Sequence, residues 1–128
     1  MNGRAVSSSL SGCRVLVVED EMLVAWELED ALSGWGCTVV GPVGRVGKAL
    51  AMLDAEAIDM AVLDVSLNGL RSYPVADALG ARGVPFVFLT GYGKDSLPSG
   101  YQACPMLQKP FEQTELAEVL TKLRTSRS

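Results

Sequence analysis

The sequence predicts an α/β fold with a doubly wound, five-stranded parallel sheet. Five short runs of apolar and β-branched residues alternate with segments whose apolar residues recur at helical spacing. The runs are apolar at nearly every position, as expected for strands that helices cover on both faces. In such an open sheet the carboxyl ends of the strands meet at one crevice, where ligands bind. The reactive side chains that end or follow four of these runs are therefore expected to share one site.

The strands are expected to be short and buried. They are predicted at residues 14–18, 37–41, 59–64, 85–89 and 105–108. The fourth run is apolar throughout, which favours a central place in the sheet.

Helices are expected between and after the strands, because apolar residues follow the i, i+3, i+4, i+7 template there. These residues are Leu28, Ala31, Leu32 and Trp35, then Val46, Ala49, Leu50 and Leu53, then Val75, Ala78 and Leu79, and finally Leu116, Val119, Leu120 and Leu123. Gly34 and Gly36 are expected to end the first helix, and Pro74 suits the first turn of the third.

The link between the fourth and fifth strands departs from this pattern. Residues 91–104 contain three glycines and one proline and show no apolar stripe. Glycine and proline are poor helix formers. We therefore expect a fourth helix that is short or poorly ordered.

The length of 128 residues indicates one domain with a core of its own. Residues 1–12 include a Ser-rich run without the apolar core of a signal peptide, and we expect a flexible lead-in there. Residues 13–125 are expected to form the folded domain, and no linker indicates a second one.

Composition excludes several classes of protein. A net charge of −4 without a basic stripe argues against nucleic acid and anionic membranes as partners, and no apolar stretch is long enough to cross a bilayer. The three cysteines show no C-x-x-C spacing and are interpreted as buried side chains in a reducing, cytoplasmic protein. The absence of histidine removes Ser-His-Asp and Cys-His chemistry and histidine metal ligands.

Three carboxylates, a hydroxyl and an amine end or follow the predicted strands. Glu19 and Asp20 come directly after the first strand, and Asp64 ends the third. Thr90 follows the fourth strand and Lys109 the fifth. Carboxylate oxygens suit Mg²⁺, and an amine can stabilise phosphoryl oxygens. The set predicts a divalent-metal and phosphoryl site, although acids after a strand can also simply favour a helix N-terminus.

With these residues in this order and spacing, the chain resembles the receiver domain of two-component response regulators, related to the chemotaxis regulator. The resemblance covers residues 14–123 and includes the Lys109-Pro110-Phe111 motif. It implies a flavodoxin-like (βα)5 fold with strand order 2-1-3-4-5. The segment PFVFLTGYG at residues 85–93 resembles the PFxFATGY signature of alphaproteobacterial single-domain regulators, with Leu89 in place of alanine.

The resemblance implies a role for each site residue. Asp64 would be the phosphoacceptor, and Thr90 and Lys109 would contact the phosphoryl group. Mg²⁺, or alternatively Mn²⁺, would be held by Glu19, Asp20, Asp64 and the backbone carbonyl of Ser66. The Lys109–Pro110 peptide bond is usually cis in the family.

Two residues depart from the family pattern. Glu19 stands where aspartate is commoner, and its extra methylene can change metal affinity. Met106 stands where many receivers carry an aromatic residue that swings inward on activation. Tyr92, two residues after Thr90, is a candidate substitute. The switch candidates are therefore Thr90, Tyr92 and Met106.

The resemblance implies a role in two-component signal transduction. Because the chain has no histidine, the phosphohistidine must belong to a partner histidine kinase or histidine phosphotransfer protein. We expect a stand-alone monomer without an output domain, which relays phosphate or switches conformation to regulate an unidentified target protein. It is expected not to be an enzyme beyond self-catalysed phosphotransfer and slow autodephosphorylation.

Three other classes are weighed against this interpretation. A phosphorylation-independent docking module would have the same fold. An aspartyl-phosphate phosphatase normally carries a D-x-D motif and a cap domain. A flavodoxin-like electron carrier needs a phosphate-cradling loop after the first strand, where this chain has carboxylates that repel phosphate.

Overall fold

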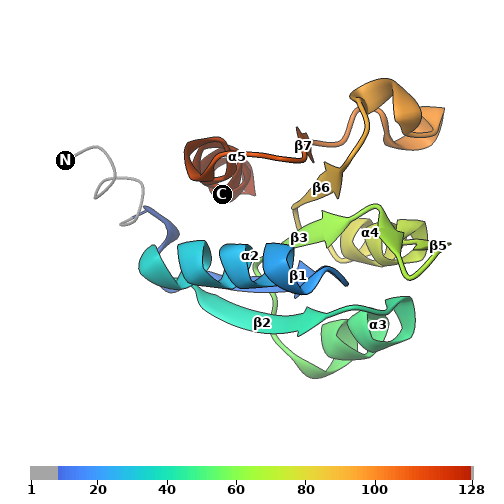
Figure 1. Cartoon of the computed structure of the whole chain (residues 1–128). Coiled ribbons are helices and arrows are strands. Elements are labelled where there is room, and N and C mark those ends of the chain that lie inside the picture. Colours follow the sequence, from blue (N-terminus) through green and yellow to red (C-terminus); the bar gives the residue numbers. More distant parts are fainter. Residues whose placement is uncertain (1–8, 128) are drawn as a thin grey trace.

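The structure is a computed structural model that describes residues 9–127. Its main sheet is parallel and has the order β2-β1-β3-β6-β7 (Figure 1). In chain order this is 2-1-3-4-5, so the predicted fold class is confirmed. The strands are β1 (Arg14–Val18), β2 (Thr38–Val43), β3 (Met60–Asp64), β6 (Phe86–Thr90) and β7 (Met106–Gln108).

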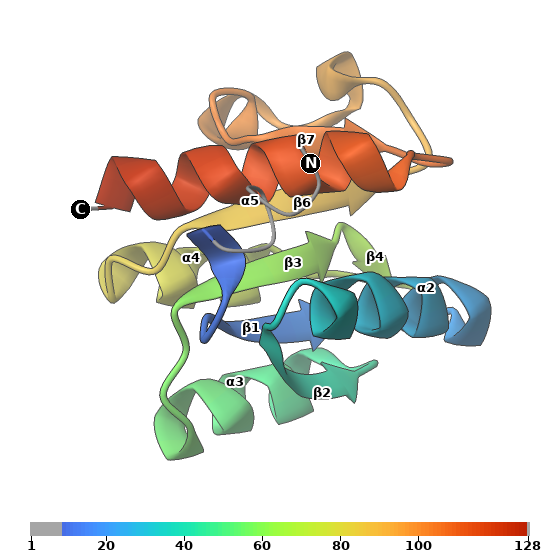
Figure 2. The same ribbon diagram turned by 90° about the vertical axis from the view of Figure 1, so that its left-hand side faces the viewer.

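Helices cover both faces of the sheet. Figure 2 shows α2 (Met22–Gly34) and α5 (Gln113–Arg127) on the side that faces the viewer. The opposite face carries α3 (Val46–Ala55) and α4 (Tyr73–Ala81). The apolar template predicted these helices correctly, except that Trp35 follows the end of α2 and is half-buried.

Two apolar clusters form the core because alternate strand residues point to opposite faces of the sheet. The α2 and α5 side holds Val15, Val17, Val62, Val87 and Leu89, together with helix residues such as Leu28 and Leu116. The α3 and α4 side holds Leu16, Val18, Ala61, Leu63 and Phe88, together with helix residues such as Leu53 and Leu79. With both faces packed, the carboxyl edge of the sheet is where polar side chains can gather.

Strand β2 extends past the predicted end at residue 41. It continues through a cis Gly41–Pro42 bond to Val43, and its pairing with β1 is irregular between Leu16 and Val18. Gly41 has φ +94, and a Cβ there would lie 2.9 Å from the Val43 nitrogen. Because β2 lies at an edge of the sheet, proline is tolerated. The extension lets the Val43 carbonyl accept the Glu19 N–H at 2.9 Å.

A small hairpin that the sequence analysis did not anticipate follows β3. Strands β4 (Ser66–Leu67) and β5 (Leu70–Arg71) pair antiparallel. The two turn residues, Asn68 and Gly69, both have positive φ, which is the backbone that Asn-Gly pairs favour in two-residue hairpins. The hairpin places its turn beside the acidic residues of the site.

The connection between β6 and β7 contains two three-residue 3₁₀ turns, Lys94–Ser96 and Ser99–Tyr101, in place of a regular helix. The expectation of a short fourth helix is confirmed. Two side chains nevertheless anchor the segment: Leu97 is 2% exposed, and the Tyr101 ring stacks on Tyr73 with centroids 4.5 Å apart.

The start of the folded domain lies before residue 13. Residues 1–8 of the predicted lead-in fall outside the described part of the chain. Of the rest, Leu10 is fully buried in the core, and the Gly12 N–H donates to the Gly36 carbonyl at 2.9 Å. Leu10 is thus part of the packed domain, because it completes the cluster beneath α2 and α5. Between residues 9 and 127, no helix is both long and apolar enough to cross a membrane.

Candidate functional site

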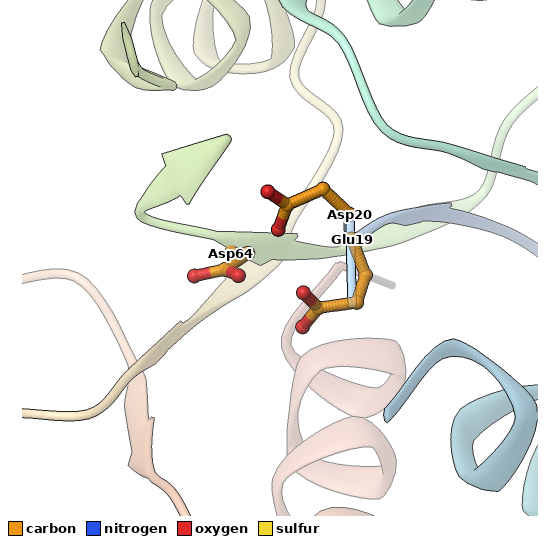
Figure 3. A group of neighbouring side chains, drawn as sticks. All are labelled: Glu19, Asp20 and Asp64. Atoms are coloured by element: carbon orange, nitrogen blue, oxygen red, sulfur yellow. The ribbon is translucent and has the colours of Figure 1, made fainter. Parts of the chain in front are cut away.

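Three carboxylates converge at the carboxyl ends of two neighbouring strands. Glu19 and Asp20 directly follow β1, and Asp64 ends β3. Because Val18 pairs with Leu63, the residues that follow them lie side by side. Their carboxylate oxygens lie within 4.8 Å of one another, and Figure 3 shows the three groups around a common space. The predicted acidic cluster is therefore present.

Glu19 is the buried member of the cluster, with 3% of its surface exposed. Its Oε1 accepts the Glu21 N–H at 3.0 Å. Its Oε2 lies 3.0 Å from Lys109 Nζ, yet it has no hydrogen-bond partner of good geometry within the described residues. Burial, reinforced by the neighbouring Asp64 carboxyl, raises the pKa of Glu19 to about 8. Without a metal ion, this side chain tends to keep its proton.

Asp20 is exposed and is fixed by the hairpin turn. Its Oδ2 accepts the Asn68 N–H at 2.8 Å, and the Asn68 side-chain amide donates to the Gly44 carbonyl at 2.9 Å. A Cβ on Gly44 would lie 3.3 Å from the Asp20 Cα, so the two loops pack closely there. The sequence analysis missed Asn68, although the Asn68-Gly69 pair was a recognisable signal for a hairpin turn.

Asp64 is buried, and both of its oxygens are engaged. Oδ1 accepts the Ser66 N–H at 3.2 Å, and Oδ2 accepts a hydrogen bond from Lys109 Nζ at 3.1 Å. The Asp64 carbonyl accepts the buried Ser72 hydroxyl at 2.5 Å. The Asp64 carboxylate is therefore held in place at the crevice by its own strand end and by Lys109.

Lys109 follows β7, and its N–H donates to the Thr90 carbonyl at 2.7 Å. Its ammonium group lies 2.7 Å from Glu21, 3.0 Å from Glu19 and 3.1 Å from Asp64. Burial lowers the pKa of Lys109, but the neighbouring Glu21, Glu19 and Asp64 carboxyl groups outweigh burial and raise it above its usual value. Lys109 is therefore a fixed positive charge, and its bond to Pro110 is cis.

The three switch candidates lie around the end of β6. Thr90 is buried, and its hydroxyl oxygen accepts the Tyr92 N–H at 3.0 Å; no hydrogen bond joins this hydroxyl to Asp64. Tyr92 is 74% exposed. Met106 is half-buried and pairs with Phe88 in the sheet. The structure thus brings Glu19, Asp20, Asp64 and Lys109 into one cluster and leaves Thr90 at its border.

An open cleft of about 380 Å³ adjoins the cluster. Its lining includes the acids Glu19 and Asp20, the exposed Met22 and Trp26 side chains of α2, and the basic residues Arg45 and Lys48. The cleft is open to solvent at the exposed Asp20.

The donor set fits a divalent cation that prefers oxygen. Three carboxylates can place one oxygen each within a small space, and Mg²⁺ is bound by oxygen ligands while keeping several waters. The buried Glu19 Oε2 lacks a hydrogen-bond partner of good geometry within residues 9–127, and a cation would supply one. The pocket therefore offers the oxygen ligands that Mg²⁺ prefers.

Residues 15–121 match the model of the response regulator receiver domain. The chain belongs to this family. The transcriptional regulatory protein TcrA of Mycobacterium tuberculosis is 37% identical to it over 121 residues, which are 89% of this chain and 46% of TcrA. The receiver domain thus spans about half the length of the curated relatives it matches. It is a receiver domain of the kind found in the phosphoacceptor proteins of two-component signal transduction.

Solved structures agree with this assignment. SdrG from Sphingomonas melonis Fr1 is 47% identical, with a TM-score of 0.79, and the match covers 88% of this chain and 96% of SdrG. A second SdrG structure, 46% identical, is described as its BeF3-activated conformation. The receiver domain of the sensor histidine kinase PA1611 from Pseudomonas aeruginosa PAO1 holds a magnesium ion in its active site cleft. At 24% identity and a TM-score of 0.73, covering 90% of this chain and 99% of that one, it supports the fold alone.

Proposed function

We propose that this receiver domain accepts a phosphoryl group on Asp64 from the phosphohistidine of a partner histidine kinase or histidine phosphotransfer protein. The observation that carries the proposal is the position of Asp64, 3.1 Å from the Lys109 ammonium. Glu19 and Asp20 complete the cluster around it. An exposed surface acid would have neither the half-buried lysine nor the paired carboxylates.

Transfer breaks the phosphorus–nitrogen bond of phosphohistidine and forms a phosphorus–oxygen bond to an Asp64 oxygen. A carboxylate is a weak nucleophile, so the reaction depends on positioning and on stabilising the charge of the phosphoryl oxygens. Lys109 already points its ammonium at Asp64 Oδ2 and can interact with a phosphoryl oxygen bound there. Its raised pKa keeps it charged throughout the reaction.

Glu19, Asp20 and Asp64, with the backbone carbonyl of Ser66, are the groups that would hold Mg²⁺ or, alternatively, Mn²⁺. The bound ion supplies charge neutralisation for the phosphoryl oxygens. The chain's own part is to keep the three carboxylates together, which the Asn68 and Ser66 N–H groups do for Asp20 and Asp64.

The signal is passed on through Thr90. Its hydroxyl can donate to a phosphoryl oxygen, and the Tyr92 N–H, which is hydrogen-bonded to that hydroxyl, would follow the movement. We infer that a downstream protein recognises the resulting change at Tyr92 rather than a movement of Met106. Slow hydrolysis of the acyl phosphate by the domain itself would return it to the unmodified state.

The test of the proposal is phosphorylation of Asp64→Asn. This variant should fold but lose labelling by acetyl phosphate or by a phosphorylated kinase. Asp30→Asn, which alters an exposed acid on α2, is the matched control and should be labelled like the wild type. Labelling retained by Asp64→Asn would overturn the assignment. If a target still binds Asp64→Asn as well as it binds the phosphorylated wild type, the protein is instead a phosphorylation-independent docking module.

A further inference from the structure

Glu21, the third acid after β1, has no role in the site as described so far. It directly precedes α2, and its side chain is 61% exposed. Its Oε1 lies 2.7 Å from Lys109 Nζ, closer than the nearest oxygen of Glu19 or Asp64. We propose that Glu21 is a positioning residue. It restrains the Lys109 ammonium in the unmodified protein and so lowers the affinity of the site for a phosphoryl group. The inference rests on the proposed role of Asp64.

The contacts of Lys109 explain why Glu21 competes. An ammonium group has three N–H donors; Lys109 Nζ donates to Glu21 at 2.7 Å and to Asp64 at 3.1 Å, and the Glu19 carboxyl lies 3.0 Å away without a hydrogen bond of good geometry. A phosphoryl group on Asp64 needs one of these donors. Glu19 and Asp64 belong to the metal-binding set, whereas Glu21 does not. The contact with Glu21 is therefore the one that can be given up while the metal ligands stay in place.

Glu21 has two physical effects, and both lower the affinity of the site for a phosphoryl group. Hydrogen bonds between charged groups are the stronger ones, so the loss of the Lys109–Glu21 contact offsets part of the gain from the new phosphoryl contact. In addition, the Glu21 carboxylate repels the negative charge that arrives with the phosphoryl group. Both effects favour the unmodified state, so removal of Glu21 should tighten binding of a phosphoryl mimic.

Three substitutions separate the contact from the charge. Glu21→Ala removes both. Glu21→Asp keeps the charge but shortens the side chain by one methylene, which breaks the 2.7 Å contact. Glu21→Gln removes the charge but keeps an oxygen that can accept from Lys109. Glu27→Gln is the matched control, because it removes one charge from an exposed glutamate on α2 that lines a separate surface hollow.

The measured quantity is the dissociation constant for beryllofluoride at saturating Mg²⁺. Exposed ion pairs are modest in strength, so Glu21→Ala should bind beryllofluoride about two- to fivefold more tightly than the wild type. Glu21→Asp should show most of this gain, and Glu21→Gln should lie between the wild type and Glu21→Ala. Glu27→Gln should match the wild type.

A second measurement observes Lys109 directly in the metal-free protein. The ammonium protons of Lys109, followed by ¹⁵N NMR, should exchange with water faster in Glu21→Ala than in the wild type. Glu27→Gln should leave this exchange unchanged. A residue that only helps α2 to begin would change the melting temperature without changing the Lys109 signal.

The outcomes separate this inference from the proposed function. If the wild type binds no beryllofluoride, the proposed function fails and Glu21 loses its role with it. If the wild type binds and Glu21→Ala binds equally or more weakly, the inference alone is overturned. It is also overturned if Glu21→Asp binds beryllofluoride like the wild type. The charge of residue 21, rather than its contact with Lys109, would then explain the effect of Glu21→Ala.

Discussion

The acidic cluster and the 91–104 segment both lie at the carboxyl edge of the sheet, but different forces hold them. In the cluster, a buried Glu19 and a buried Asp64 share the Lys109 ammonium, and neighbouring N–H groups bind the carboxylates. In the segment, apolar packing dominates: Leu97 enters the core, and Tyr101 stacks on Tyr73. The cluster should therefore respond to pH and cations, and the segment to changes in packing.

The acidic cluster and the 91–104 segment also differ in how regular their supporting structure is. The cluster is built on the ends of β1 and β3, whose register is fixed by their buried side chains. The segment is held by the buried Leu97, the stacked Tyr101 and two short turns, and residues 91–93 at its start are exposed. Three perturbations test this division, from the largest expected effect to the smallest.

The largest change in folding stability is expected from the titration of Glu19 with pH. The unfolded chain releases the Glu19 proton near pH 4.5, whereas the folded protein without metal keeps it until about pH 8. Between these values the folded state binds more protons, so its stability falls as pH rises. The loss is on the order of 3–5 kcal/mol from a shift of this size at about 1.4 kcal/mol per pKa unit. Denaturant unfolding at a series of pH values in EDTA measures it.

Two substitutions locate the origin of this pH dependence. Glu19→Gln should flatten the stability profile between pH 5 and pH 8, because the buried group no longer titrates. Asp20→Asn should leave the slope in place, since burial and the Asp64 carboxyl, rather than Asp20, raise the pKa of Glu19. Mg²⁺ should recover stability at pH 8 in the wild type but less so in Asp20→Asn. An equal slope in Glu19→Gln would show that another group is responsible.

The second perturbation tests whether the 91–104 segment is part of the core. Leu97 is 2% exposed and packs in the same cluster as Phe88 and Leu79. Leu97→Ala should therefore lower the free energy of unfolding by about 2–3 kcal/mol, the lower part of the range for a buried leucine. Leu23→Ala, which truncates a leucine that is 72% exposed, is the control and should change it by less than about 0.5 kcal/mol. Equal small losses would mean that the segment is only loosely attached.

The sequence predicted the positions of those site residues that end or directly follow a strand. Asp64, Asp20 and Lys109 could be placed because parallel strands end at a common edge. The sequence identified Glu21 only as a third acid after the first strand. Its proposed role depends on a contact with Lys109, which is 88 residues away in the sequence. That contact depends on the conformations of the loops that follow β1 and β7, and a local sequence pattern does not predict these conformations.

The 91–104 segment was harder to predict because its anchors are isolated. Glycine and proline correctly indicated the lack of a regular helix, but a single buried Leu97 has no periodic partner to reveal it. Tyr101 is placed by its ring contact with Tyr73 and by the hydrogen bond of its hydroxyl to Asp77 at 2.8 Å. That bond also raises the pKa of Tyr101. Tertiary contacts of this kind have no sequence spacing of their own.

The smallest measured change, a modest slowing of amide exchange, is expected where the two regions meet, at Thr90. A new hydrogen bond from Thr90 to a phosphoryl oxygen, together with Lys109, offers about 2–4 kcal/mol of differential binding. A complete two-state shift needs about 5.5 kcal/mol, so phosphorylation alone should shift the segment only in part. Amide exchange across residues 91–104 should therefore slow by a modest factor when beryllofluoride and Mg²⁺ are added.

Substitutions of Tyr92 and Met106 test which side chain transmits the movement of Thr90 to the 91–104 segment. The Tyr92 N–H is already bonded to the Thr90 hydroxyl, and its exposed ring has surface to bury when Thr90 moves. Tyr92→Ala should therefore blunt the slowing of exchange. Met106→Ala should matter little, because Met106 is already packed against the core beside Phe88. A dominant effect of Met106→Ala, or equal exchange with and without beryllofluoride, would show that the acidic cluster and the segment are not coupled through Thr90 and Tyr92.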